Sequence, residues 1–235
     1  MQRRTGQTHG VNGILFVASG KMTEVLSAAS WPEYKVSKLS EELTYYTFSQ
    51  GVAKSPGTRM DFSIIDSTGQ KQRKIFAAAG NVAWDEATPG GNATPATETA
   101  SDRLLHIWLT PHGLIWAALT ADGKGIANGV TMSQENNKTV LVIPVNGVPV
   151  KVILGTDNRP EKVEARIKHP ILGDTSLEIN YSGYRDFEHA YGVYFPAHIE
   201  EKLGGRTVLD LTVMEFHTNP YIVFPVPAII QQAAK

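Results

Sequence analysis

The chain contains no cysteine in its 235 residues, so a disulfide, a thiolate metal site and a cysteine nucleophile are all excluded. Charge of one sign is also lacking, because 22 Lys and Arg residues stand against 23 Asp and Glu residues without a long block of either sign. This balance gives no electrostatic footprint for nucleic acid or for an anionic membrane surface. We therefore expect no nucleic-acid partner.

Long apolar runs are missing as well. The run Ile14–Ala18 follows two arginines, but a secretory signal needs about 7–15 apolar residues, so we expect no working export signal here. Residues 1–38 are interpreted as a leader with a short amphipathic helix over Lys21–Ser30, which Trp31 and Pro32 terminate.

The motifs of several large catalytic families are absent too. The sequence holds no G-x-S-x-G, no H-E-x-x-H, no P-loop and no G-x-G-x-x-G. The sequence therefore indicates a fold more clearly than it indicates a reaction, and we expect no cofactor.

Apolar residues gather in Ser101–Leu119, SDRLLHIWLTPHGLIWAAL. This stretch predicts two short helices that meet at a corner, with Ser101 as the cap of the first, Thr110 as the cap of the second and Pro111 at its first position. Both helices are apolar on almost every side, which indicates burial. Polar residues and Pro111 interrupt the stretch too often for a transmembrane span.

Most of the remaining chain reads as strands rich in β-branched and aromatic residues and joined by Asn, Asp and Gly turns. Ala87–Ala100, rich in Thr, Gly and Pro, is expected to be a mobile loop. The expected strands are Leu43–Val52, Arg59–Asp66, Gln72–Ala79, Asn81–Asp85, Val130–Gln134, Lys138–Val145, Val148–Leu154, Lys162–Ile167, Ser176–Tyr184, Val193–Lys202 and Thr207–Phe216.

Short turns permit hairpins and exclude the crossover helices of a parallel sheet. A sheet of about 10 strands curls on itself, and only the helical pair could fill its curved face. We therefore predict an α+β fold: a curved antiparallel β-sheet, open as a half-barrel, with the helical pair packed on the concave face. One curved-sheet domain is expected over residues 39–219, followed by a C-terminal tail over 220–235.

Five segments together carry a resemblance to a known family: Trp108–Gly113 (WLTPHG), Pro170–Asp174 (PILGD), Tyr181–Phe187 (YSGYRDF), Gly192–Pro196 (GVYFP) and Gly204–Val213 (GGRTVLDLTV). Over roughly Leu39–Asn219 the chain resembles the N-terminal domain that precedes a metallo-β-lactamase-fold hydrolase in exported bacterial proteins. That domain is in turn similar to the LolA-like half-barrel of bacterial lipoprotein carriers.

The resemblance implies a periplasmic or extracellular location and a metallo-hydrolase domain, or another protein, as partner. It does not imply activity, because the H-x-H-x-D-H cluster of such hydrolases is absent from this sequence. A function inferred from fold alone is an association only.

The aromatic residues allow two interpretations. They can pack in the core, or they can line an apolar cleft for a small molecule or an acyl chain if the helical pair lifts from the sheet. Tyr184, Arg185 and Asp186 form a polar cluster that is either a structural ion pair or a catalytic acid with its neighbours. The candidate ligand-binding residues are Trp84, Trp108, His112, Trp116, Tyr184, Asp186 and Phe195.

The histidines also leave alternatives open. His106 and His112, six residues apart, are better explained as core or capping residues than as metal ligands or proton carriers. A three-histidine metal site from His189, His198 and His217 is geometrically conceivable but has no support in their spacing.

Two functional hypotheses follow. The favoured one is a non-catalytic binding or accessory domain that holds an apolar ligand or partner in the concave face. The alternative is a hydrolase of unrecognised type, in which a histidine works with Asp174, Asp186 or Asp210 at the open end of the sheet. A histidine within about 3 Å of both a carboxylate and a hydroxyl, in a cleft, would favour the enzyme.

We predict that the protein binds no structural or catalytic metal. It has no cysteine, and none of its 7 histidines stands at an i, i+3 or i, i+4 spacing on an expected helix. Elemental analysis after dialysis should find substoichiometric zinc, iron and manganese, and a chelator should leave the melting temperature unchanged. One tightly held metal per chain would contradict this expectation.

Overall fold

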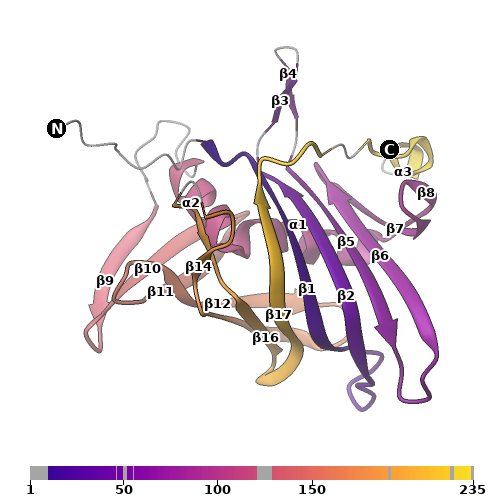
Figure 1. Cartoon of the computed structure of the whole chain (residues 1–235), viewed down its shortest axis with the longest axis horizontal. Helices are drawn as coiled ribbons and strands as arrows, with labels where there is room; N and C mark the ends of the chain where they lie inside the picture. Colours follow the sequence, from indigo (N-terminus) through magenta and orange to yellow (C-terminus); the bar gives the residue numbers. More distant parts are fainter. Residues whose placement is uncertain are drawn as a thin grey trace.

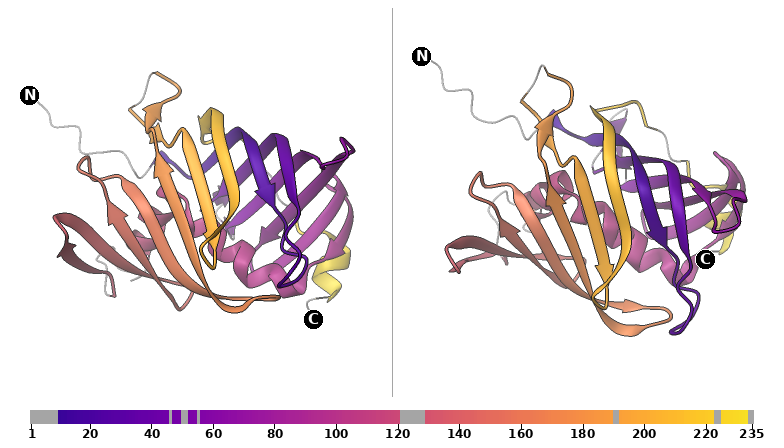
Figure 2. Two further views of the ribbon diagram at one scale, coloured as in Figure 1. Left: turned by 90° about the horizontal axis from the view of Figure 1, so that it is seen from below. Right: turned by 60° about the horizontal axis from the view of Figure 1, so that its bottom comes forward.

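The computed structural model describes residues 10–45, 47–49, 52–54, 56–120, 129–189, 192–222 and 225–233. Its main body is one antiparallel sheet of 13 strands that curves around a pair of helices, α1 (Ala100–Leu109) and α2 (Pro111–Thr120) (Figures 1 and 2). The two outermost strands do not pair with each other, so the sheet stays open. The predicted open half-barrel with a helical pair on its concave face is confirmed.

The sheet contains more strands than the expected 10 or so. In spatial order it runs β8 (Gly91–Pro95), β7 (Val82–Thr88), β6 (Lys71–Ala79), β5 (Gly57–Ile65), β2 (Glu33–Thr44), β1 (Gly13–Thr23), β17 (Arg206–Thr218), β16 (His198–Leu203), β13 (Gly173–Ser182), β12 (Pro160–His169), β11 (Val148–Leu154), β10 (Lys138–Val145) and β9 (Thr131–Glu135). Two small hairpins, β3 (Thr47–Ser49) with β4 (Val52–Lys54) and β14 (Arg185–Asp186) with β15 (Tyr194–Phe195), lie outside it.

The N-terminal region is part of the sheet. β1 pairs with β2 on one side and with β17 on the other, so the first and last long strands meet at the centre. The expected leader and helix over residues 1–38 are therefore wrong wherever the structure describes them. Ile14, Phe16 and Ala18, each two residues apart, are at most 3% exposed, which is the spacing of one strand face and not of a helix face.

Three other expectations need correction. Ala87–Ala100, expected as a mobile loop, contains β8 and a 3-10 turn. Gly90 at φ 74° allows the tight turn between β7 and β8, in which Thr88 pairs with Gly91. The expected strand Leu43–Val52 ends at Thr44 and gives way to the β3–β4 hairpin, and Pro196 separates β15 from β16 within the expected strand Val193–Lys202. The C-terminal tail carries a helix, α3 (Ala228–Ala233), which packs on β7 and β8.

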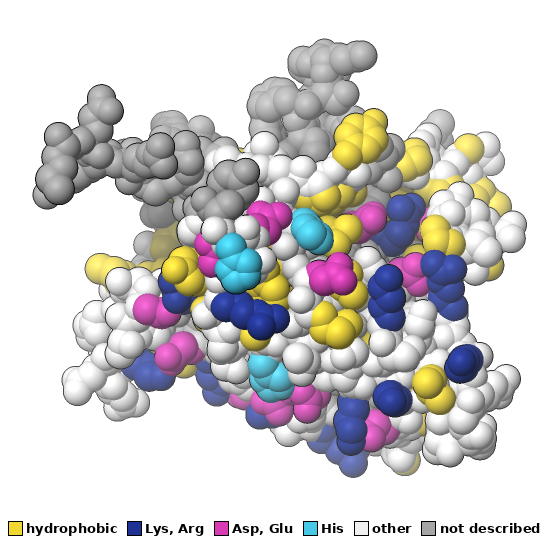
Figure 3. All heavy atoms as spheres, in the orientation of Figure 1, with side chains coloured by type: hydrophobic (Ala, Val, Ile, Leu, Met, Phe, Trp, Pro, Cys, Tyr) yellow, Lys and Arg dark blue, Asp and Glu magenta, His cyan; other side chains and the backbone are white. Residues whose placement is uncertain are grey.

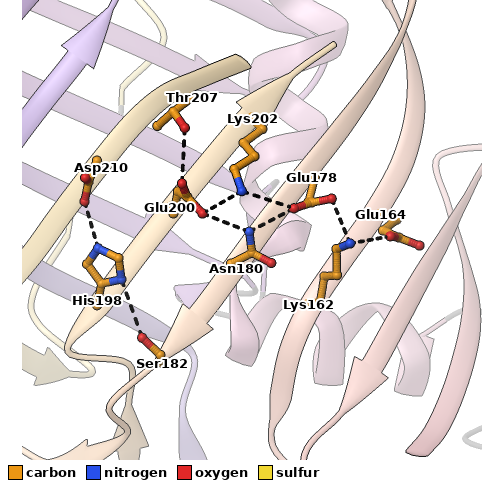
Figure 4. Close-up of polar contacts among 10 residues, drawn as sticks. All are labelled: Lys162, Glu164, Glu178, Asn180, Ser182, His198, Glu200, Lys202, Thr207 and Asp210. Atoms are coloured by element: carbon orange, nitrogen blue, oxygen red, sulfur yellow. Dashed lines mark hydrogen bonds and ion pairs between the residues drawn. The ribbon is translucent and has the colours of Figure 1, made fainter. Parts of the chain in front are cut away.

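The two faces of the sheet differ in chemistry. The concave face is apolar and packs on α1, which lies against β5, β6, β7 and β12, and on α2, which lies against β10. The opposite, convex face carries alternating charges across β12, β13 and β16, where Lys162, Glu178, Lys202 and Glu200 form ion pairs at 2.8–3.6 Å (Figure 4). Charged side chains of both signs are interspersed over the face shown in Figure 3. Such exposed pairs keep a face solvated and add little stability.

None of the described helices is long and apolar enough to cross a membrane.

The centre of the sheet depends on one close backbone approach. A Cβ at Gly20 on β1 would lie 2.0 Å from the backbone oxygen of Asp210 on β17, whereas a Cβ at Gly10 would meet nothing within 4 Å. We predict that Gly20→Ala lowers the free energy of unfolding by about 3 kcal/mol, because the backbone must shift to relieve the clash. Gly10→Ala should cost less than about 0.5 kcal/mol in the same urea titration. Equal costs would show that β1 and β17 do not approach in this way.

Candidate functional site

The corner between the two helices forms largely as the sequence indicates. Thr110 Oγ1 accepts a hydrogen bond from the Gly113 amide at 3.2 Å, and the Thr110 carbonyl accepts one from the Leu114 amide at 2.9 Å. Thr110 thus caps α2, with Pro111 as the first helical residue. The expected cap at Ser101 is wrong, because α1 already begins at Ala100 and Ser101 Oγ contacts Asp102 instead.

Two buried tyrosines fix this corner to the sheet. The hydroxyl of Tyr45, which follows β2, shares a hydrogen bond with Thr110 Oγ1 at 2.7 Å. The hydroxyl of Tyr181, on β13, donates to the carbonyl of Leu109 at 2.9 Å, at the end of α1. Burial raises the pKa of both phenols, so both remain neutral donors at physiological pH. The central strands β1 and β17 divide the sheet into two halves, and the corner is therefore attached to both of them.

A partly buried ionic group lies under the middle of α1, with Glu41 as its most buried member. His106 Nε2 is 3.2 Å from Glu41 Oε1 on β2, and His106 Nδ1 is 4.0 Å from Glu201 Oε2 on β16. Glu41 is only 2% exposed and also accepts a hydrogen bond from Thr58 at 3.3 Å. The imidazole thus bridges two carboxylates that belong to opposite halves of the sheet.

Burial lowers the pKa of His106. The charge of Glu41 and its hydrogen bond to the imidazole outweigh this effect, and the charge of Glu201 adds to them, so the pKa of His106 is raised to about 9. Burial also raises the pKa of the Glu201 carboxyl, although His106 opposes the rise. The imidazole is therefore protonated at neutral pH and forms a true ion pair with Glu41. The two ring nitrogens face different carboxylates, an arrangement that suits a bridge and not a metal site.

Three of the aromatic candidates lie on or beside the helical pair. Trp108 is half-buried and its ring lies 6.5 Å from that of Tyr45, so it lies at the edge of the core and not in its centre. Trp116 is also half-buried, and its indole N–H donates to the carbonyl of Val11 at 2.7 Å. Phe195 is fully buried and stacks on Phe216 at 4.4 Å.

His112 completes the aromatic cluster. Its ring stacks near Phe195 at 6.0 Å and near Phe216 at 5.6 Å. Its Nδ1 atom is buried and has no hydrogen-bond partner among the described residues. Burial lowers the pKa of His112 to about 4, so this histidine is neutral while His106 is charged.

The other candidates do not join this group. Trp84 lies on the face opposite α1: it packs with Ile230 of α3, whereas the neighbouring Asp85 pairs with Arg103 of α1 at 2.7 Å.

Tyr184 and Asp186 have structural partners. The Tyr184 hydroxyl donates to the carbonyl of Pro160 at 2.7 Å. Asp186 accepts from the amides of Glu188 and Gly192 at 3.2 and 3.0 Å and thereby shapes the β14–β15 hairpin.

A row of apolar side chains crosses the concave face from the core to the free edge of the sheet. Cross-strand register places its five members side by side on β13, β12, β11, β10 and β9 in turn. Ile179, Val163 and Val152 are 1% exposed, Leu141 is half-buried and Met132 is 74% exposed. Among the described residues, this row of apolar side chains thus runs from the core to an exposed position on β9.

The expected histidine sites can be placed as well. Among the described residues no three His, Asp or Glu side chains are arranged to hold a metal, and His198 and His217 pair separately with Asp210 and Glu188. No contact between His189 and either His198 or His217 is observed among the described residues.

One arrangement resembles the hydrolase alternative. His198 Nε2 lies 2.7 Å from Asp210 Oδ1, and His198 Nδ1 lies 3.5 Å from Ser182 Oγ (Figure 4). The side chains of His198 and Asp210 are 45% and 50% exposed, on the convex face. The three strands are interior to the sheet, so their backbone N–H groups pair with neighbouring strands and are not free to stabilise an oxyanion. A structural hydrogen bond between His198 and Asp210 explains this arrangement better.

The sequence interpretation missed Glu41 and Glu201. Both carry the same signal: Glu41 lies between Leu39 and Leu43 at the spacing of one strand face, and Glu201 lies likewise between Ile199 and Leu203. A carboxylate at a buried strand position needs a partner, which here is His106.

The chain matches no model of a known protein family and none of the curated proteins. The family resemblance read from its short motifs therefore stays a prediction.

We predict that His106→Gln lowers the free energy of unfolding at pH 7 by about 3 kcal/mol, because Glu41 is left buried without a cation. The folded pKa of about 9 lies above the unfolded value of about 6.5, so the stabilisation is complete below pH 6.5 and is lost as the pH rises through 9. Urea titrations across this range should show the loss in the native chain and not in the variant.

The matched control is His198→Gln, which removes a histidine from an exposed pair. It should cost less than about 1 kcal/mol and leave the alkaline decline in place. An unchanged alkaline decline in His106→Gln would show that Glu41 and His106 do not form the buried pair.

Proposed function

We propose that this chain is a non-catalytic binding domain that holds an aliphatic ligand, such as an acyl chain, against the concave face beside α2. The observation that carries the proposal is the apolar row that starts fully buried at Ile179 and ends at Met132, which is 74% exposed. An apolar surface that continues from a core into solvent is typical of a binding site.

The helix next to this row supports the same function. α2 packs on β10, and Ile115, one of its apolar residues, is 37% exposed. Trp108 and Trp116, half-buried at the same helical pair, offer large apolar surfaces with a polar edge. Val, Leu, Ile and Met side chains such as those of this row suit a flexible aliphatic chain better than a polar substrate.

The family resemblance agrees with this proposal without proving it. A half-barrel similar to that of lipoprotein carriers is expected to hold acyl groups, and the domain it resembles precedes a metallo-hydrolase. On that basis we propose a periplasmic or extracellular location, with a metallo-hydrolase domain as a candidate protein partner. The hydrolase alternative is less well supported, because the arrangement in which one histidine faces both a carboxylate and a hydroxyl, His198 with Asp210 and Ser182, lies exposed on the convex face.

The proposal can be tested by titrating the protein with a dansyl-labelled undecanoic acid and following dansyl fluorescence. We predict saturable binding that Ile115→Glu and Met132→Glu each weaken about tenfold, because a carboxylate at either position must lose water when the chain binds.

Two matched variants serve as controls. Ile229→Glu on α3 and Met214→Glu on β17 change the same residue types at exposed positions away from the helical pair. Both should leave the affinity unchanged. Absence of saturable binding, or an equal loss in all four variants, would contradict a ligand site beside α2.

A further inference from the structure

We propose that the outer edge of β9 pairs with β9 of a second copy of this chain, antiparallel and about a two-fold axis through Ser133. The two half-barrels would then share one continuous sheet. This inference is independent of the proposed ligand.

The two edges of the sheet are built differently. At one edge, β8 ends in Pro95, contains Asn92 in the left-handed region at φ 50°, and packs against α3. Proline, irregular backbone and a covering helix are devices that stop an edge strand from pairing. That edge is therefore protected.

β9, at the other edge, has none of these devices in the part of the chain that the structure describes. All five of its residues are exposed, none is proline, and its register with β10 is unbroken. Met132 adds a large apolar side chain that is 74% exposed. An edge strand of this kind is a template for pairing with another strand. β9 is the outermost strand at the left end of the sheet in Figure 1.

The backbone geometry of β9 also suits pairing with another strand. Asn136 and Asn137, at φ 50° and 62°, form a two-residue turn into β10 of the type that matches strand twist. Glu135 and Lys138 flank that turn and pair directly. The alternation of an antiparallel pair then directs the backbone N–H and C=O groups of Met132 and Gln134 away from β10. These groups point towards an incoming strand.

Its charge pattern favours a second copy as the occupant. The single charged residue of β9, Glu135, already pairs with Lys151 at 2.7 Å. With Ser133 on the axis, Glu135 faces Thr131 of the second copy and Met132 faces Gln134, so no like charges oppose each other. A two-fold contact needs such a self-complementary surface. Five residues make a small contact, so the dimer belongs with weak, concentration-dependent assemblies.

The absence of native cysteine allows a direct test, because each single-cysteine variant then carries one thiol. Ser133 would face its own symmetry mate as a pair without mutual backbone hydrogen bonds, with Cα atoms about 4.5 Å apart, which suits a disulfide. Ser133→Cys should form a disulfide dimer under mild oxidation. Thr131→Cys, two residues along the same strand face, and Thr94→Cys, on the protected edge, should crosslink at least about tenfold more slowly, because their thiols lie too far from their mates.

Sedimentation equilibrium of the native chain should show a dimer that grows with concentration. Gln134→Pro removes an outward N–H, a change that an edge strand tolerates without unfolding, and it should abolish the dimer. Circular dichroism would confirm that the variant is folded. Equal crosslinking of all three cysteine variants, a native chain that stays monomeric, or a dimer that survives Gln134→Pro would each overturn the proposal.

Discussion

The structure depends on covering one apolar face. Thirteen antiparallel strands that twist but do not close leave a concave surface, and Val, Ile and Leu side chains along the strands make it apolar. A single contiguous segment, residues 100–120, supplies the two helices that cover it. The position of their corner therefore decides how much of the face is buried, and Tyr45 and Tyr181 set it by bonding to Thr110 and Leu109.

The ionic group beneath α1 serves orientation more than stability. Burying a charged pair costs about as much as its attraction returns, so Glu41, His106 and Glu201 add little net free energy compared with apolar side chains of the same size. They do, however, exclude other positions of α1, because any shift of the helix would leave a buried carboxylate without its partner. Apolar packing alone is less directional.

The two helices consequently differ in how they are held. α1 has ionic contacts with both halves of the sheet, whereas α2 lies chiefly against β10 and keeps Ile115 partly exposed. The less tightly covered part of the concave face coincides with the end of the apolar row at β9. A binding function fits this asymmetry, since a site needs apolar surface that the protein itself does not bury completely.

The sequence by itself determined the class of fold. Asn and Gly turns between alternating strands required an antiparallel sheet, and the apolar stretch around Trp108 required a buried helical pair with its cap at Thr110. These features follow from contacts within a few residues. Only the tertiary structure decided that β1 pairs with β17, that Trp84 faces α3 and not the helical pair, and that Glu41 and Glu201 meet at His106. Residues 41 and 201 come together because the sheet curves, and strand order and curvature are properties of the whole chain that no local pattern records.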